Sequence, residues 1–378
     1  MKILHIITSL DQGGAEAVLC RLVTSKREGI EHTVISLKGE GFYGPVLVAS
    51  GVAVHCFDFE RFLQWRSLSE LRRLIKRVAD ISPDVVQTWL YHADLVGGLA
   101  ARLAGCKAVV WGVRSASLSP LLMGRSTRIV AWLCARLSGF VPAAIATCSQ
   151  EAAKVHKRLG YDASKFEVIA NGFDLNIFKP DTDARKRLRQ SWGVSDNEVL
   201  IGCVARWDPY KDHANLLEAL SAALMAGCQL RCVLVGGGLD DRNPALRGLM
   251  AKYNLGESVI LAGKQSDIPS VMNALDFHVL PSASEAFPNV VAEAMACGVP
   301  AIVTDVGDAS LIVGATGWVV PPKNPQLLAQ AMLDAAAGAH LDGHQQRRDA
   351  ARQRIADNFS MDKMTQSYVD LWRSVVSK

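Results

Sequence analysis

The sequence predicts an α/β protein with two doubly wound domains, each built on a parallel sheet that helices cover on both faces. Two observations support this prediction. Short β-branched runs alternate with longer helical stretches along the 378-residue chain. The same alternation restarts after residues 171–180, where Asn-Gly and Lys-Pro pairs mark turns. We therefore expect one domain over residues 1–172, a second over residues 173–359, and a hinge near their junction.

The strands are expected where apolar and β-branched residues cluster. In the first domain they are KILHIIT, HTVISL, DVVQTW, AVVWGV and AAIATCS. In the second domain they are VLIGCVA, LRCVLVG, SVILAG, FHVLP and PAIVT. The segment 360–378 follows the second set of strands and carries apolar residues at helical spacing, so it predicts an amphipathic helix that covers another surface.

The composition excludes several classes of protein. Hydrophobic residues make up 49% and charged residues 21%, which is typical of a folded globular chain. The cysteines include no Cys-x-x-Cys pair, which favours free thiols in a reducing cytoplasm and no metal site. We expect no signal peptide and no membrane span, because no uncharged run reaches about 20 apolar residues. The chain shows no recognised nucleic-acid-binding motif.

The positive charge is concentrated in one segment. Residues 95–150 contain no Asp or Glu but include several Lys and Arg residues. Within this segment, SPLLMGRSTRIVAWLCARLSGF mixes Leu, Met, Ile and Trp with arginines. This mixture favours docking of residues 114–140 on an anionic membrane surface. A core helix with a basic rim would have the same composition, and the sequence leaves both interpretations open.

Candidate ligand-binding residues follow the expected strands, because open parallel sheets bind ligands beyond the carboxyl ends of their strands. Gly13 and Gly14 follow the first strand and precede a helix, whose N-terminus favours an anion. They do not form the G-x-G-x-x-G pattern of a dinucleotide site. In the second domain, two cationic residues and a glycine run follow expected strands, an arrangement that suits a diphosphate. The two cationic residues are also compatible with ordinary charges on the protein surface. The cationic residues and the glycines are Arg206, Lys211, Gly236, Gly237 and Gly238.

The stretch SEAFPNVVAEAMACGVP, residues 284–300, places two carboxylates around the start of an apolar helix. The helix is expected over residues 288–297, with Pro288 in its first turn. Its N-terminus would attract an anion, whereas the carboxylate of Glu285 beside it would repel a phosphate and should face hydroxyls instead. A sugar nucleotide offers both groups. Alternatively, Glu285 caps the helix and Glu293 forms an internal ion pair.

Several runs resemble the motifs of glycosyltransferase family 4, the retaining transferases with two Rossmann-like domains known as the GT-B fold. The run SEAFPNVVAEAMACGVPAIVTDVGD resembles the signature of that family. VARWDPYKD, VLVGGG, AGKQSDI, ANGFDLNIFKP and LDQGGAE resemble its other blocks, in the same order. The resemblance spans most of the chain and makes the second domain the donor-binding one. It also implies that the last helix packs back on the first, acceptor-side domain.

The resemblance implies a role for each motif residue. Arg206 and Lys211 would neutralise the donor diphosphate, Glu293 would bind the ribose, and Glu285 would bind the donor sugar. Gly13 and Gly14 would let the first domain close over the diphosphate and the acceptor. The backbone around the start of the helix would hold phosphate, and the loop from Gln265 to Ile268 would border the base. The helix-start residues are Phe287, Pro288, Asn289 and Val290.

One part of the family pattern is missing. Many members carry a histidine at the end of a first-domain strand, where this chain has Arg114-Ser115. His92 is the nearest candidate histidine, and Arg114 is a candidate phosphate contact; either residue is also compatible with a structural role.

The resulting prediction is a retaining hexosyl- or N-acetylhexosaminyl-transferase in cell-surface polysaccharide synthesis. It would take a sugar from a nucleotide-linked donor, UDP above all, without a metal ion or another cofactor, because two cations and a helix N-terminus can stabilise the leaving charge. The acceptor would be lipid-linked or a saccharide, reached at the inner face of the cytoplasmic membrane. Two alternatives are a sugar-nucleotide epimerase or hydrolase of the same architecture and a catalytically inactive sugar-nucleotide-binding subunit.

Overall fold

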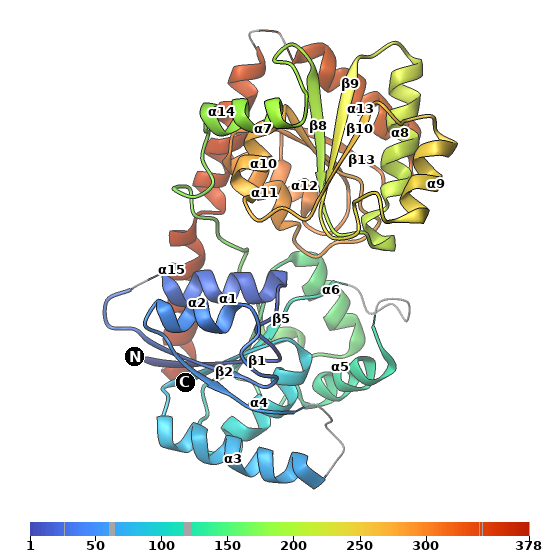
Figure 1. Ribbon diagram of the computed structural model, residues 1–378. Helices are drawn as coiled ribbons and strands as arrows, with labels where there is room; N and C mark the ends of the chain where they lie inside the picture. The colour runs from blue at the N-terminus through green and yellow to red at the C-terminus, as the bar shows by residue number, and fades with distance from the viewer. Residues whose placement is uncertain (26, 60–64, 117–122, 340, 342, 378) are drawn as a thin grey trace. The chain divides into compact units, whose positions relative to one another are not determined.

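A computed structural model describes the chain except residues 26, 60–64, 117–122, 340, 342 and 378 (Figure 1). The described chain divides into two compact units. Unit 1 comprises Met1–Gly172 and Met361–Lys378, and unit 2 comprises Phe173–Ser360. The chain therefore leaves unit 1 after Gly172 and returns to it after Ser360. No helix among the described residues is long and apolar enough to cross a membrane.

Unit 1 contains a seven-stranded parallel sheet with the strand order β3-β2-β1-β4-β5-β6-β7. The order reverses between β1 and β4, which defines a doubly wound sheet. The strands are β1 (Lys2–Ile7), β2 (Glu31–Ser36), β3 (Ala53–Cys56), β4 (Val85–Trp89), β5 (Val109–Val113), β6 (Ala144–Thr147) and β7 (Phe166–Val168). The helices are α1 (Gly14–Thr24), α2 (Tyr43–Ala49), α3 (Trp65–Ile81), α4 (Tyr91–Leu103), α5 (Arg125–Leu137), α6 (Gln150–Leu159), the 3-10 turn η1 (Ala163–Lys165) and α15 (Met361–Val376).

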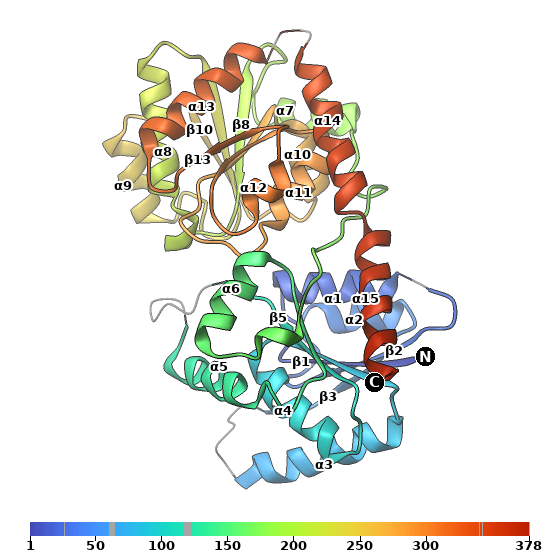
Figure 2. The same ribbon diagram turned by 180° about the vertical axis from the view of Figure 1, so that it is seen from behind.

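Helices cover both faces of this sheet and bury its central strands β4, β5 and β6 throughout. Apolar residues of α1, α2 and α15 form the core on one face, and those of α3, α4 and α5 form the core on the other. Figures 1 and 2 show α15 lying beside α1, although the two helices come from opposite ends of the sequence. On α15, Trp372 is fully buried and its Nε1 donates to Gln87 Oε1 of β4 at 3.2 Å. The last helix is thus part of the core of unit 1.

Unit 2 contains a six-stranded parallel sheet with the strand order β10-β9-β8-β11-β12-β13, which reverses between β8 and β11. The strands are β8 (Val199–Val204), β9 (Leu230–Val235), β10 (Val259–Gly263), β11 (Phe277–Leu280), β12 (Ala301–Thr304) and β13 (Trp318–Val320). The helices are α7 (Thr182–Ser191), the 3-10 turn η2 (Pro209–Lys211), α8 (His213–Met225), α9 (Pro244–Lys252), α10 (Ile268–Ala274), α11 (Asn289–Ala296), α12 (Ala309–Val313), α13 (Pro325–Gly338) and α14 (Gly343–Asn358).

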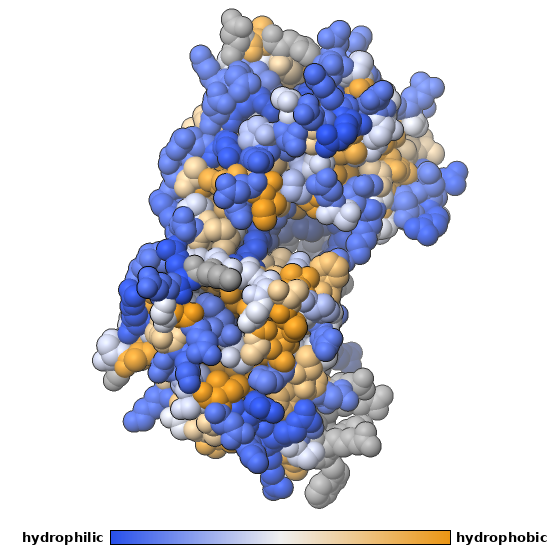
Figure 3. All heavy atoms as spheres, turned by 60° about the vertical axis from the view of Figure 1, so that its left-hand side comes forward, coloured by the Kyte–Doolittle hydropathy of each residue, from blue (hydrophilic) through white to orange (hydrophobic). Residues whose placement is uncertain are grey.

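The two faces of the unit 2 sheet have separate cores. Residues of α8, α9 and α13 pack on one face, and residues of α7, α10 and α11 pack on the other. The outer surface is mixed: on the face that Figure 3 shows, apolar side chains lie in patches among hydrophilic ones. The prediction of two doubly wound α/β domains is confirmed. The sequence patterns missed β3, β7 and β13, each of which has at most four residues and lies at or next to a sheet edge.

Candidate functional site

The carboxyl edge of the unit 2 sheet brings Lys211 and Glu285 together. Lys211 ends the turn η2 after β8, and Glu285 follows β11. Because β8 and β11 are the neighbours between which the strand order reverses, a crevice is expected above them. Lys211 Nζ lies 2.6 Å from Glu285 Oε1, and the side chains are only 24% and 12% exposed. Two residues that sequence reasoning selected separately therefore form one ion pair.

Hydrogen bonds between the two loops hold this pair in place. The Ser282 hydroxyl donates to Glu285 Oε1 at 2.7 Å, and the Ala283 N–H donates to the Tyr210 carbonyl at 2.7 Å. Gly307 packs closely against the backbone of the same loop, where a Cβ on residue 307 would lie 2.6 Å from the carbonyl oxygen of Glu285. Sequence reasoning missed Ser282 and Gly307. Both lie within or beside the motif segments, but no spacing rule singles them out.

Helix α11 begins beside this ion pair. Pro288 is its N-cap residue, and the side chain of Pro288 makes no capping hydrogen bond. Pro288 therefore does not cap the first-turn N–H groups, which carry the positive end of the helix dipole. Asn289 and Val290 form the first turn, and Glu293 lies half-buried on the second. The observed helix is slightly shorter than the predicted 288–297. A carboxylate, a lysine and a helix N-terminus are thus neighbours along one edge.

The glycine run after β9 packs against the loop after β8. Gly236 has a φ of +147°, and a Cβ there would lie 1.8 Å from the Ala205 carbonyl oxygen. The Trp207 N–H donates to the Gly237 carbonyl at 2.7 Å. Only glycine therefore permits the close approach of these two loops at position 236. The approach fixes the backbone that carries Arg206.

Arg206 itself is accessible. Its side chain is 72% exposed and pairs with Asp208, with 2.9 Å between Nη2 and Oδ2. Such an exposed pair is worth little to stability, so the guanidinium can take another anion. Gln265 and Ile268 lie after β10, two strands from β8, where Gln265 Nε2 donates to the Ala262 carbonyl at 2.7 Å and Ile268 begins α10.

In unit 1, Gly13 and Gly14 form the start of α1. Gly13 is the N-cap, Gly14 is the first helical residue, and the carboxyl of Glu16 lies over Gly13. Burial raises the pKa of Glu16, with a contribution from Asp11. The N-terminus of α1 therefore faces a carboxyl group of its own helix, a feature that the sequence reasoning did not anticipate.

His92 and Arg114 lie at the carboxyl edge of the unit 1 sheet. His92 is the second residue of α4 and half-buried; burial, and then the charge of Lys38, lower its pKa. Arg114 Nη1 donates to Asn171 Oδ1 at 2.9 Å, and its Nη2 donates to the Tyr368 hydroxyl. Its guanidinium carbon also lies 4.5 Å from the ring centre of Trp89. The structure thus gives Arg114 protein partners where the sequence suggested a phosphate.

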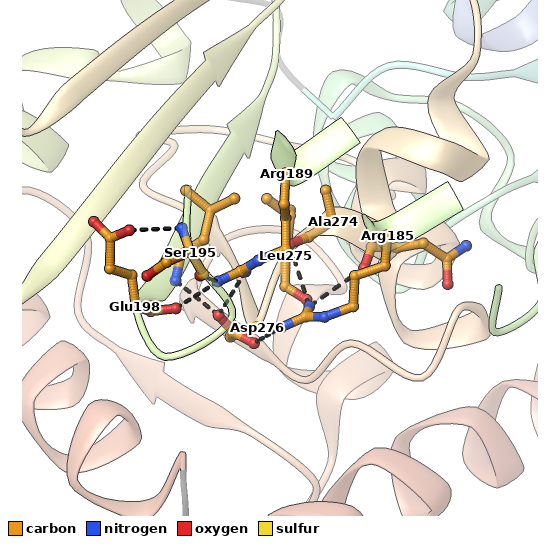
Figure 4. Close-up of polar contacts among 9 residues, drawn as sticks. Arg185, Arg189, Ser195, Glu198, Ala274, Leu275 and Asp276 are labelled. Atoms are coloured by element: carbon orange, nitrogen blue, oxygen red, sulfur yellow. Dashed lines mark hydrogen bonds and ion pairs between the residues drawn. The ribbon is translucent and has the colours of Figure 1, made fainter. Parts of the chain in front are cut away.

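A second charged cluster in unit 2 lies away from the candidate site. Arg185 and Arg189 of α7 both point toward Asp276, at 2.6 and 3.2 Å (Figure 4). Asp276 directly precedes β11 and also accepts the N–H of Leu200 at 2.7 Å. The cluster therefore lies at the amino ends of the strands, opposite the edge that holds Lys211. Its role is to fasten α7 to the sheet.

Metal ligation has no support in the described residues: no three His, Cys, Asp or Glu side chains there are grouped so that they could hold an ion. A metal-independent reaction remains an expectation.

The fold defines a class. Two doubly wound, Rossmann-like units are the architecture of the GT-B fold. The sequence matches the profile of Glycosyltransferase Family 4 over residues 12–177 and that of Glycosyl transferases group 1 over residues 198–337. The chain belongs to this family of glycosyltransferases, whose members use nucleotide-sugar donors.

Individual relatives agree with this assignment. EpsF of Bacillus subtilis strain 168, described as a glycosyltransferase, is 26% identical over 80% of this chain and 79% of its own length. An Escherichia coli UDP-Gal:alpha-D-GlcNAc-diphosphoundecaprenol alpha-1,3-galactosyltransferase is 26% identical over 68% of this chain and 66% of its own. The crystal structure of Anabaena HepE in complex with UDP matches with a TM-score of 0.84 and 25% identity, covering 99% of this chain and 100% of HepE.

Proposed function

We propose that the chain transfers a hexosyl or N-acetylhexosaminyl group, with retention, from a UDP-sugar to a lipid-linked or saccharide acceptor in cell-surface polysaccharide synthesis. The observation that carries the proposal is the Lys211–Glu285 pair beside the N-terminus of α11. The choice of UDP is supported by HepE, whose structures contain UDP, and UDP with glucose. The choice of a lipid-linked acceptor is supported by the diphosphoundecaprenol in the name of the Escherichia coli relative.

The chemistry of the site suits departure of a diphosphate. As the bond to the sugar breaks, negative charge grows on the leaving UDP. Lys211, Arg206 and the first-turn N–H groups of α11 would stabilise that charge, which lowers the barrier without a metal ion. Glu285 would hold the hydroxyls of the donor sugar. Glu293, one turn further along α11, would accept hydrogen bonds from the ribose.

Calorimetric titration with UDP and GDP tests the donor site directly. We expect UDP to bind the wild-type protein and Glu293→Ala to weaken binding roughly ten- to a hundredfold, since a hydrogen bond to a charged group is worth about 1.5–3 kcal/mol. Glu257→Ala, at an exposed position of unit 2, is the matched control and should bind as wild type does. Equal affinity in Glu293→Ala would make this glutamate structural.

Product analysis separates the transferase from its alternatives. With a UDP-sugar and an undecaprenyl-diphosphate-linked saccharide, we expect a new glycosidic product. Turnover of the donor without any acceptor would instead favour a hydrolase or an epimerase. Binding without turnover under both conditions would favour an inactive binding subunit.

We also propose that α5 docks unit 1 on an anionic membrane surface. Its outer face carries a stripe of exposed cationic and apolar side chains, whereas Ala131, Cys134 and Ala135 face the core. Two apolar members, Ile129 and Trp132, are 59% and 48% exposed. Part of this stripe lines a hollow of about 520 Å³. Residues 117–122 of the predicted docking segment lie outside the described chain. The stripe comprises Arg125, Arg128, Ile129, Trp132 and Arg136.

Flotation with liposomes that contain phosphatidylglycerol tests this docking. We expect the wild type to float, and the variant Arg125→Glu, Arg128→Glu, Arg136→Glu to lose about a hundredfold or more in affinity, since each basic residue near such a surface is worth about 1 kcal/mol. The control carries Arg72→Glu, Lys76→Glu and Arg77→Glu on α3, with the same change in charge on exposed positions of unit 1. Equal flotation of the two variants would refute a role of α5.

A further inference from the structure

Helix α11 is attached at both of its ends to the two segments that join unit 1 and unit 2. We define the first joining segment as residues 173–178 and the second as residues 358–360; both belong to unit 2. We propose that Phe287 and Arg352 are positioning residues that couple donor binding at α11 to these joining segments. The inference rests on the proposed function, because it takes the N-terminus of α11 as the phosphate site.

At the N-terminal end of α11, the ring of Phe287 contacts both joining segments. It lies nearly parallel to Phe173, with 6.3 Å between the ring centres, and edge-on to Phe359 at 5.8 Å. All three rings are at least 93% buried. The sequence motif placed the backbone of Phe287 near the phosphates but gave no role to its side chain. The side chain is an aromatic contact between the phosphate loop and the joining segments.

The two joining segments are also bonded to each other at this point. The Phe173 N–H donates to the Phe359 carbonyl at 2.9 Å, and Phe173 forms a parallel β-bridge with Ser360. Phe287 therefore contacts both residues of a hydrogen bond between the only stretches through which the described chain passes from one unit to the other. A change in the position of the ring acts on both stretches at once.

At the C-terminal end of α11, Arg352 of α14 makes the second attachment. Its Nη1 donates to the carbonyl of Ala296, the last residue of α11, and to that of Phe178 at 2.9 Å. Its Nη2 donates to the Leu175 carbonyl at 3.1 Å. One guanidinium therefore satisfies a terminal carbonyl of α11, of the kind that helix ends leave without a partner, and two carbonyls of the first joining segment.

These contacts make α11 a rigid connection from the phosphate site to the joining segments. A short helix in a close-packed core moves as one body, because its neighbours resist compression. Phosphate bound at the first turn restrains α11, and the restraint reaches Phe173 and Phe359 through the ring of Phe287. Donor binding should therefore stabilise the hydrogen bond between the two segments, and linkage makes the effect reciprocal.

Hydrogen–deuterium exchange of the full chain, with and without saturating UDP, tests the coupling. In the wild type we expect UDP to slow exchange in residues 173–178 and 358–360 at least about fivefold, the lower range of typical couplings. The variants Phe287→Leu and Arg352→Gln, each saturated with UDP, should lose most of this slowing of exchange. The variant Phe287→Tyr, which keeps an aromatic ring, should show the same slowing as the wild type. Phe277→Leu is the control: Phe277 is also buried in unit 2, but its ring packs on Trp318 and His344.

If the wild type binds UDP and the joining segments exchange as before, the inference is wrong while the proposed function stands. If Phe287→Leu keeps the full slowing, or Phe277→Leu loses as much, the ring of Phe287 is only structural. If UDP does not bind, the proposed function fails and takes the inference with it. Should Phe287→Leu fail to fold, Phe359→Leu tests the same contact.

Discussion

The Lys211–Glu285 pair combines a structural and a functional requirement in one contact. It joins the loops after β8 and β11, and Ser282 fixes the carboxylate that takes part in it. Because both side chains are partly buried, a charge left alone there would be costly, and each residue therefore keeps the other in place. A ligand that brings both a phosphate and a hydroxyl can satisfy the lysine and the glutamate together.

His278 of β11 is a residue whose environment disfavours its charged form. It is fully buried, and neither ring nitrogen has a hydrogen-bond partner among the described residues. Burial, and then the charge of Lys211, lower the pKa of His278 to about 3. Sequence reasoning gave this histidine no role, since nothing in FHVLP distinguishes a buried imidazole from an exposed one.

We predict that His278→Leu stabilises unit 2 at pH 7 and weakens its acid sensitivity. Removing a buried polar group without partners should gain roughly 1–3 kcal/mol. Because the folded-state pKa of His278 lies below its unfolded value of about 6.5, only the unfolded state takes up a proton between about pH 6.5 and 3, and His278 therefore lowers the stability of unit 2 as the pH falls through that window. Each pH unit in that window costs up to about 1.4 kcal/mol. Urea unfolding between pH 4 and 8 measures the slope; an unchanged slope would refute the prediction.

Helix α7 shows how one element is fixed by charge as well as by packing. Arg189 is 1% exposed and donates to the carbonyls of Ser195 and Glu198, both at 2.6 Å, in addition to Asp276 (Figure 4). Burial lowers the pKa of the Arg189 guanidinium, and Asp276 opposes that effect. The arginine therefore links α7, the turn before β8 and the start of β11.

We predict that Arg189→Met destabilises unit 2 by about 3 kcal/mol. The substitution leaves buried carbonyls without a donor, and breaking a buried ion pair typically costs about 3–5 kcal/mol. The expected loss lies at the low end of this range because Asp276 keeps its ion pair with Arg185. Arg242→Met is the control, since the Arg242 side chain is 89% exposed and should change stability by less than about 0.5 kcal/mol. Thermal unfolding of both variants would show the difference, and equal shifts would refute it.

The elements differ in how well the sequence predicts them. Six-residue strands such as β1 and β8 are rich in buried apolar residues, and both are visible in the sequence. The edge strands β3, β7 and β13 are short and only partly buried, so pairing with a neighbour, rather than local pattern, defines them. The sequence places Lys211 after a strand and Glu285 before a helix, and the structure joins the two side chains. The contact of Phe287 with Phe173 and Phe359 depends on distant segments that no local spacing reveals.

The whole chain is assembled so that unit 1 is completed by α15. Trp372 packs edge-on to His5 and His32, each with 5.8 Å between ring centres, and lies 5.5 Å from Tyr368. His5 Nε2 and His32 Nδ1 are 3.0 Å apart, and burial lowers the pKa of His32 to about 4. Neutral rings are therefore the form that packs against α15.

We predict that Trp372→Ala destabilises unit 1 by about 3–5 kcal/mol, as expected when a buried tryptophan is truncated. Arg373→Ala, at the exposed position next to it on α15, should leave stability within about 0.5 kcal/mol of the wild type. Hydrogen exchange resolved by segment would show faster opening in unit 1 and no change in unit 2. Equal loss of protection in both units would contradict the prediction.

The return of the chain to unit 1 also sets an order of events during synthesis. The ribosome makes residues 173–360, the whole of unit 2, before it makes α15. Unit 2 is continuous in sequence, so it can fold while α15 is still being translated. Until then, the apolar residues of unit 1 against which Trp372 and Tyr368 pack stay uncovered. An apolar surface of the nascent first domain therefore stays in contact with water until a second domain of similar size has been translated.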